Sequence, residues 1–136
     1  MPTTYMLDTC ICSYIMKQHP VEVLQHLDAL SQNDRVVISA ITYSEMRYGQ
    51  IGKKAPAKLG TAIDQFVKRL NGVLPWDASA VDMALKVRVQ LASEGTPIGS
   101  NDAAIAAHAI VTGCTLVTHN VREFSRVAGL TYEDWA

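Results

Sequence analysis

Short apolar runs alternate with longer segments of helical spacing along this chain, and that alternation constrains the fold more than any other feature. The short runs are expected to be strands at residues 4–7, 36–38, 73–74, 115–118 and 130–132. The longer segments are expected to be helices at residues 10–17, 21–30, 40–49, 59–70, 78–94 and 101–112. This order predicts an α/β domain with a central parallel sheet of about five strands and helices on both faces.

The 136 residues contain no linker, repeat or low-complexity tract, so a single domain over residues 1–136 is expected. No apolar run is long enough to span a membrane, and the N-terminus has no secretory signal pattern, which predicts a cytoplasmic protein. The cysteines Cys10, Cys12 and Cys114 are odd in number and are expected to be packed, reduced thiols.

Three carboxylates stand where an acid is out of place. Asp8 ends an apolar run, Glu45 interrupts a mostly apolar stretch, and Asp102 opens an alanine-rich run. Ile41, Glu45 and Tyr48 share one helix face, so Glu45 is expected to point inward. An uncompensated buried carboxylate is costly, so each acid needs a partner. Salt bridges are one explanation and a shared divalent cation is another, which three converging acids favour.

The predicted topology offers a place where these acids could meet. In parallel sheets, ligands lie beyond the carboxyl ends of the strands. Asp8 follows the first expected strand, Glu45 lies beyond the second, and Asn120 follows the fourth. Asp102 is less constrained, because its helix could start at either edge of the sheet and helix dipoles favour an acid in the first turn. Convergence of the three acids is therefore a hypothesis.

The residue types at these positions suit metal-assisted chemistry. Asp8, Glu45 and Asp102 are hard oxygen ligands without a supporting His or Cys set, which favours Mg²⁺, or Mn²⁺ as a substitute. One ion, or two, could bind a phosphate oxygen and orient a water for attack. The chain has no Gly-x-Ser-x-Gly setting, no phosphate-binding loop and no dinucleotide fingerprint.

Basic residues gather in the middle of the chain. Residues 40–72 contain six basic and two acidic residues, a local charge of +4, and the rest of the chain carries −5. A nucleic-acid backbone could lie across Lys53, Lys54 and Lys58, and a solvated helix surface explains the charge equally well. His119 is a further candidate for substrate contact, whereas His108 is expected in the core.

Local signals make further predictions about the helices. Ser39, Asp77 and Ser100 are expected to cap the helices that follow them. The helix after Asp77 has an expected buried stripe that consists of Val81, Ala84, Leu85, Arg88 and Leu91. Within this stripe Arg88 would pair with a carboxylate or, alternatively, contact a nucleic-acid phosphate.

Five segments together resemble the PIN-domain ribonucleases, and most closely the VapC toxins of bacterial VapBC toxin–antitoxin systems. They are residues 7–9, Glu45, residues 97–102, residues 117–124 and the closing residues 129–135. The resemblance spans essentially the whole chain and matches Asp8, Glu45 and Asp102 to three acidic positions of the family. There are two departures. Cys10 stands where similar proteins commonly have Asn, and Asn120 stands where many have a fourth acid, so Asn120 or the nearby Glu123 would complete the site.

The resemblance implies a metal-dependent endoribonuclease that cleaves structured RNA, with a tRNA anticodon loop as the preferred substrate, and thereby inhibits translation. It also implies a homodimer silenced by a VapB antitoxin, which would provide the protein's only link to DNA. One rival is a phosphoacceptor signalling domain, but its acidic pair after the first strand and its late lysine are missing, since no lysine follows Lys86. Another is a catalytically inactive PIN-like module that binds RNA or protein; the presence of all three acids argues against it.

Overall fold

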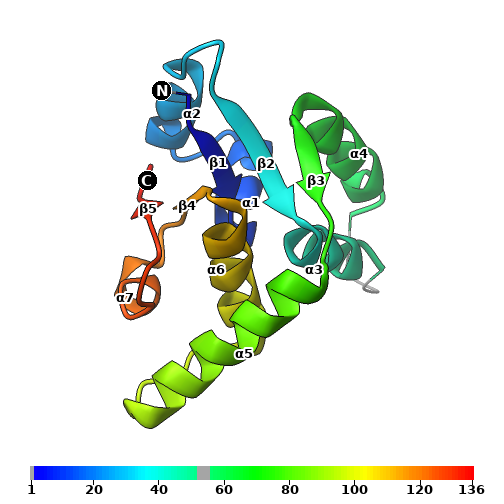
Figure 1. Cartoon of the computed structure of the whole chain (residues 1–136). Helices are drawn as coiled ribbons and strands as arrows, with labels where there is room; N and C mark the ends of the chain where they lie inside the picture. Colours follow the sequence, from blue (N-terminus) through cyan, green and yellow to red (C-terminus); the bar gives the residue numbers. More distant parts are fainter. Residues whose placement is uncertain (1, 52–55) are drawn as a thin grey trace.

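The computed structural model describes residues 2–51 and 56–136, and its centre is a five-stranded, all-parallel sheet in the order β3-β2-β1-β4-β5 (Figure 1). The strands are β1 Thr4–Leu7, β2 Arg35–Ser39, β3 Gly72–Leu74, β4 Thr115–Val117 and β5 Tyr132–Glu133. The predicted fold class is confirmed. β1 lies between β2 and β4, so the strand order reverses there, and the crevice beyond its carboxyl end is the expected ligand position.

Seven helices surround the sheet in the described residues. They are α1 Thr9–Lys17, α2 Val21–Asp28, α3 Ala40–Ile51, α4 Leu59–Arg69, α5 Ala78–Ser93, α6 Ser100–Thr112 and α7 Val121–Phe124. The helix α5 runs past the lower end of the sheet in Figure 1 and packs against α6. None of the described helices is both long and apolar enough to cross a membrane.

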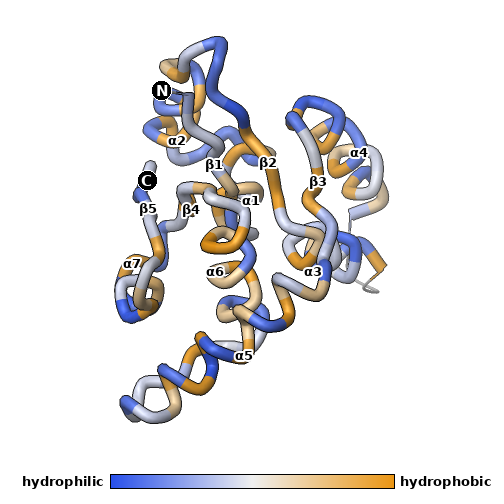
Figure 2. Tube along the Cα trace, viewed as in Figure 1, coloured by the Kyte–Doolittle hydropathy of each residue, from blue (hydrophilic) through white to orange (hydrophobic). Residues whose placement is uncertain are grey.

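Alternation along the strands divides the core into two layers. Met6 packs in a cluster with residues of α5 and α6, whereas its neighbour Leu7 packs in a second cluster with residues of α1 and α4. Successive side chains of a strand point to opposite faces, so both faces of the sheet need helical cover. Figure 2 shows that β2 is hydrophilic at its start and hydrophobic along its middle, where the strand lies between these two layers.

The helix starts agree with the predictions at two of three positions. The Asp77 carboxylate accepts a hydrogen bond from Ala80 N at 3.0 Å, and Ser39 Oγ accepts one from Ile41 N at 3.0 Å. The prediction for Ser100 is wrong. Gly99 occupies the cap position without a side-chain bond, and Ser100 is the first helical residue, since the turn of α6 starts one residue earlier than expected.

Three further expectations need correction. The helix α5 buries Ala80, Ala84, Val87 and Leu91, so its core stripe is rotated away from Val81, Leu85 and Arg88, which are exposed. Arg88 has no ion-pair partner among the described residues. The last strand lies at Tyr132–Glu133 and not at residues 130–132, and the four-residue α7 was not predicted because so short a helix shows no periodicity. The three cysteines are free thiols, as expected.

Candidate functional site

A cavity of about 400 Å³ opens beyond the carboxyl ends of β1 and β4, and all three predicted acids line it. Its walls come from four parts of the chain and consist of Asp8, Thr9, Cys10, Ser13, Glu45, Asp102, Asn120 and Phe124. The hypothesis that the acids converge is therefore confirmed in the geometry. The wall contains many side-chain oxygen atoms that can bind a cation or accept a hydrogen bond, so it favours cations and groups that donate hydrogen bonds.

Asp8 has a structural task as well as a place in the cavity. It follows β1, caps α1, and is only 5% exposed. Its Oδ1 accepts hydrogen bonds from Ile11 N and from the thiol of Cys10, each at 3.0 Å. Cys10 thus supplies a polar contact at the position where relatives commonly have Asn. Burial raises the pKa of Asp8, although the Thr118 hydroxyl, Cys10 and Ile11 donate to its carboxylate and oppose that rise.

Glu45 projects from α3 and is held by a side chain that the sequence analysis missed. Thr9 Oγ1 donates to Glu45 Oε1 at 2.6 Å, which joins α1 to α3 across 36 residues of sequence. Glu45 is half-buried, as its inward direction required, whereas Tyr48 on the expected same face is 82% exposed. The position of Thr9 directly after Asp8 was the only signal of its role in the sequence.

Asp102 lies in the first turn of α6 and experiences the charges of the other acids. Its pKa rises to about 6, first because burial removes water and then because Glu123, Glu45 and Asp8 are close enough to repel it. The helix-start explanation of Asp102 is also correct, since α6 begins at Ser100. One carboxylate therefore occupies a favourable helix position and an unfavourable cluster of like charge.

Asn120 and Glu123 both contribute to the rim of the site. Asn120 lines the cavity, and its Nδ2 donates to Glu123 Oε2 at 2.9 Å. Glu123 in turn is the largest charge acting on the pKa of Asp102. The two candidates for the fourth position are thus bound to each other, and they come from α7 and the residue before it.

The acids of the cavity do not by themselves form a closed metal-binding cage. Among residues 2–51 and 56–136, no three His, Cys, Asp or Glu side chains are arranged to hold a metal ion by themselves. Mg²⁺ usually keeps several waters and takes only one or two protein carboxylates, so it does not require a complete set of protein ligands. The raised pKa values of Asp8 and Asp102 reflect ionised forms that lack compensation, which a bound cation would provide.

The predicted basic contacts are only partly described. Lys53 and Lys54 lie outside the described residues, and Lys58 is exposed just before α4. Within the same basic stretch, Arg47 is already paired with Asp64 and lies over the Tyr43 ring, so it is not free to bind phosphate. His119 is exposed, faces Asp134 at 3.2 Å, and is outside the residues that line the cavity.

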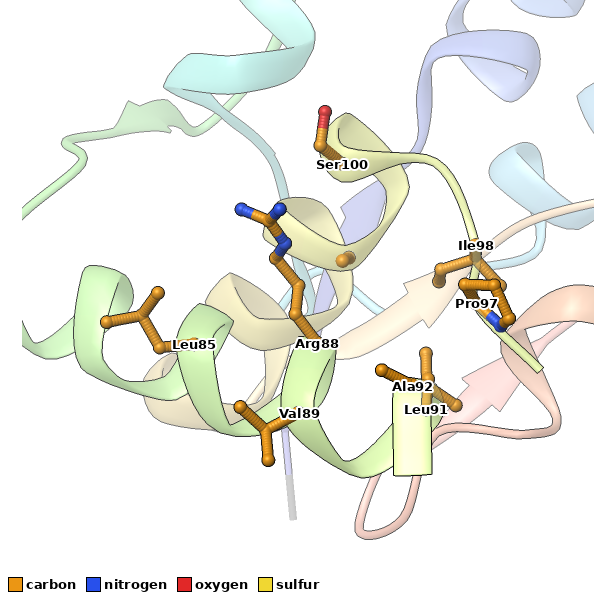
Figure 3. A pocket seen from close by; sticks show the side chains of 9 residues that line it. Leu85, Arg88, Val89, Leu91, Ala92, Pro97, Ile98 and Ser100 are labelled. Atoms are coloured by element: carbon orange, nitrogen blue, oxygen red, sulfur yellow. The ribbon is translucent and has the colours of Figure 1, made fainter. Parts of the chain in front are cut away.

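A second hollow, of about 490 Å³, lies between α5 and the start of α6 and contains no acid (Figure 3). It is mostly apolar, with Leu85, Val89 and Ile98 in its wall. Its single charged side chain is Arg88, which extends from α5 on the side where Ser100 lies. The metal-binding chemistry considered above therefore belongs to the acid-lined cavity alone.

Comparisons with known proteins match the whole architecture. The PIN domain family matches residues 5–130. The chain is 37% identical over 131 residues to "Ribonuclease VapC2" of Rickettsia felis, covering 96% of this chain and 97% of that protein. It is 39% identical over 132 residues to the "tRNA(fMet)-specific endonuclease VapC" of Shigella flexneri, covering 97% and 98%.

Two solved structures give the same picture in three dimensions. The crystal structure of VapBC2 from Rickettsia felis bound to a promoter DNA fragment matches with a TM-score of 0.89 and 35% identity, covering 98% of this chain and 100% of that one. VapBC-1 from nontypeable Haemophilus influenzae matches with a TM-score of 0.87 and 38% identity, covering 98% of each chain.

Proposed function

This chain belongs to the PIN-domain family, among its VapC ribonucleases, and we propose that it is a Mg²⁺-dependent endoribonuclease that acts as the toxin of a VapBC pair. One observation carries the proposal. Asp8, Glu45 and Asp102 come from distant parts of the sequence and line one cavity at the switch point of the parallel sheet. Mutual repulsion among them is the arrangement expected of a site built for a divalent cation.

The residues of the cavity would divide the work of phosphodiester hydrolysis. Asp8 and Asp102, together with Glu45, would hold Mg²⁺, which supplies charge neutralisation at the phosphate when bound. Glu45, oriented by the Thr9 hydroxyl, would accept a proton from the attacking water. Asn120, fixed by its bond to Glu123, would orient that water or a phosphate oxygen through its amide. Water is the nucleophile, which agrees with the absence of an activated serine.

We infer that the substrate is structured RNA, with tRNA as the preferred class and its anticodon loop as the expected point of cleavage. The relatives from Shigella flexneri and Salmonella typhimurium, named tRNA(fMet)-specific endonucleases, support this choice. Loss of a tRNA would inhibit translation. The exposed Lys58 and the neighbouring Lys53 and Lys54 are the expected contacts to the RNA backbone.

A VapB antitoxin is the partner expected to silence the enzyme, and DNA would be reached only through that antitoxin. A homodimer is the expected state of the toxin itself. Val81, Leu85 and Val89 recur every four residues along α5 and are 40%, 54% and 69% exposed beside the apolar hollow of Figure 3. Burying such a stripe in a second copy would remove it from water. A cytoplasmic location is expected, because the proposed tRNA substrate and the antitoxin partner are found there.

A cleavage assay tests the proposal directly. Purified protein is incubated with tRNA across a Mg²⁺ titration, with and without excess chelator, and with Asp8→Asn as the matched control. Cleavage that needs both Mg²⁺ and Asp8 is expected. Cleavage that persists in chelator would overturn the metal dependence. RNA binding without any cleavage would identify the chain as an inactive PIN-like binding module.

A further inference from the structure

A buried polar pair lies behind the acid-lined cavity and takes no part in the chemistry above. Ser39 at the end of β2 and His108 on α6 are 0% and 1% exposed, and Ser39 Oγ lies 2.7 Å from His108 Nδ1. Among the described residues this is the only fully buried hydrogen bond between two side chains. A buried polar pair that joins residues 69 apart in sequence needs a reason beyond packing.

The neighbours of the pair favour one direction for this hydrogen bond. Ser39 Oγ already accepts a bond from Ile41 N at 3.0 Å, so its own hydrogen is free to be donated to Nδ1 of His108. Nε2 then carries the ring proton, and burial lowers the pKa of His108, which keeps the ring neutral. The Trp76 ring packs edge to face with the imidazole of His108, with the ring centroids 5.3 Å apart and the ring planes at 90°. The Ser39 hydroxyl thus accepts one hydrogen bond and donates another at a single geometry.

The pair is separated from two of the acids by the same number of residues. Ser39 directly precedes α3 and lies six residues before Glu45, and His108 follows Asp102 by six residues on α6, a rise of about 9 Å along a helix. The helices α3 and α6 therefore run in opposite directions past one another, with the hydrogen bond at one end of their contact and the acids at the other.

The buried surface of α6 explains why a directional contact is needed. It consists largely of alanines, with Ala103, Ala106, Ala107 and Ala109 all buried. Alanine side chains allow close approach but interlock weakly, so they resist sliding and rotation of a helix poorly. A buried hydrogen bond does resist them, because any shift leaves both polar groups unsatisfied away from water.

We propose that Ser39 and His108 are positioning residues that hold α3 and α6 in the one register at which Glu45 and Asp102 face the same metal ion. The inference rests on the proposed metal-dependent function and goes beyond it, because it assigns the geometry of the site to a contact outside the cavity. Neither residue lines the cavity, so both act only through the acids that their helices carry.

The test compares two buried hydroxyls, one on the residue just before α3 and one in its first turn. Ser39→Ala removes the hydroxyl that bonds His108, whereas Thr42→Val removes a buried hydroxyl of α3 whose Oγ1 has no partner. Mn²⁺ affinity is measured by titration calorimetry without RNA, and tRNA cleavage is resolved into kcat and KM. For Ser39→Ala we expect about tenfold weaker Mn²⁺ binding and a lower kcat at similar KM. Thr42→Val is expected to stay within about twofold in both, whatever its thermal stability.

A second pair of variants covers the case in which Ser39→Ala fails to fold. Asparagine can place a polar atom near the position of Nδ1, whereas leucine cannot, so His108→Asn should retain more Mn²⁺ affinity than His108→Leu. Equal Mn²⁺ affinity in wild type and in the folded Ser39 or His108 variants would overturn the inference. A wild-type protein that neither binds Mn²⁺ nor cleaves RNA would instead overturn the proposed function on which it rests.

Discussion

The two hollows of this molecule are similar in size and opposite in character. The cavity beyond β1 and β4 measures about 400 Å³ and is lined by acids that repel one another, whereas the hollow beside α5 measures about 490 Å³ and is largely apolar. Among the described residues, the wall of the first has acids but no basic residue, and the wall of the second has apolar side chains exposed to water. Size alone does not distinguish them; the chemistry of each wall is the basis for proposing a cation at the first and a protein surface at the second. The predictions below test that separation.

The largest effect is expected from a single carboxylate of the acid-lined cavity. Asp8→Asn should reduce tRNA cleavage by about a thousandfold or more, because the metal loses a charged ligand. The fold should survive, since asparagine caps a helix as well as aspartate does and can still accept the bond from Ile11 N. Cleavage rates and circular dichroism measure the two properties. Near-normal cleavage by the folded variant would remove Asp8 from the site.

The apolar hollow should respond to a change that leaves the cavity alone. Val89→Asp places a charge on the 69% exposed stripe of α5 and should weaken self-association at least about tenfold. Folding should change little, because the side chain is exposed in one copy. Analytical ultracentrifugation measures the dimer, and Gln65→Asp, at an exposed position on α4, is the matched control. Equal dimerisation of both variants would place the interface elsewhere.

The repulsion within the cavity should be visible in the stability of the metal-free protein. The folded pKa of Asp102 is raised to about 6, above its ordinary value of 3.8, so stability is greatest below the ordinary value and falls as pH rises through 6. Asp102→Asn removes that loss and should stabilise the metal-free protein by about 1 kcal/mol above pH 7, after allowance for solvent screening. At pH 4 the two should unfold at nearly the same urea concentration. A difference that does not grow with pH would contradict the repulsion.

The smallest effect is expected outside both hollows. Lys58→Gln should weaken tRNA binding only a few-fold and lower the salt slope of log K by about one unit or less. Adding Lys53→Gln and Lys54→Gln should lower the slope further, with Mn²⁺ affinity unchanged. Fluorescence anisotropy across a salt series measures the slope. An unchanged slope in the triple variant would show that the RNA backbone lies on another surface.

Local patterns predicted much of this molecule. The spacing of apolar residues placed the first four strands and six of the seven helices, and the misfit of three acids with their surroundings identified the cavity. Helical spacing alone misplaced the buried face of α5, because Ala80 and Ala84 fill the core there while the larger Leu85 faces outward. Alanine carries a weak periodic signal, so the larger side chains misled the prediction.

Contacts between distant segments were beyond the reach of the sequence. The bond from Thr9 to Glu45 and the bond from Ser39 to His108 join residues 36 and 69 apart, and no local pattern marks either pair. Both depend on how the helices dock, which is fixed by packing on the sheet. The sequence therefore identifies the acids of the site, and the tertiary structure identifies the residues that orient them.

The central position of β1 in the sheet also affects the order in which the protein folds during synthesis. Tyr5 pairs with Val36 on one side and with Thr115 on the other, so the central strand gains its second neighbour only after most of the chain has left the ribosome. Asp102 and Asn120 emerge equally late. A nascent chain thus carries Asp8 and Glu45 long before it carries Asp102 and Asn120. The acid-lined cavity can therefore form only after both ends of the chain have been synthesised.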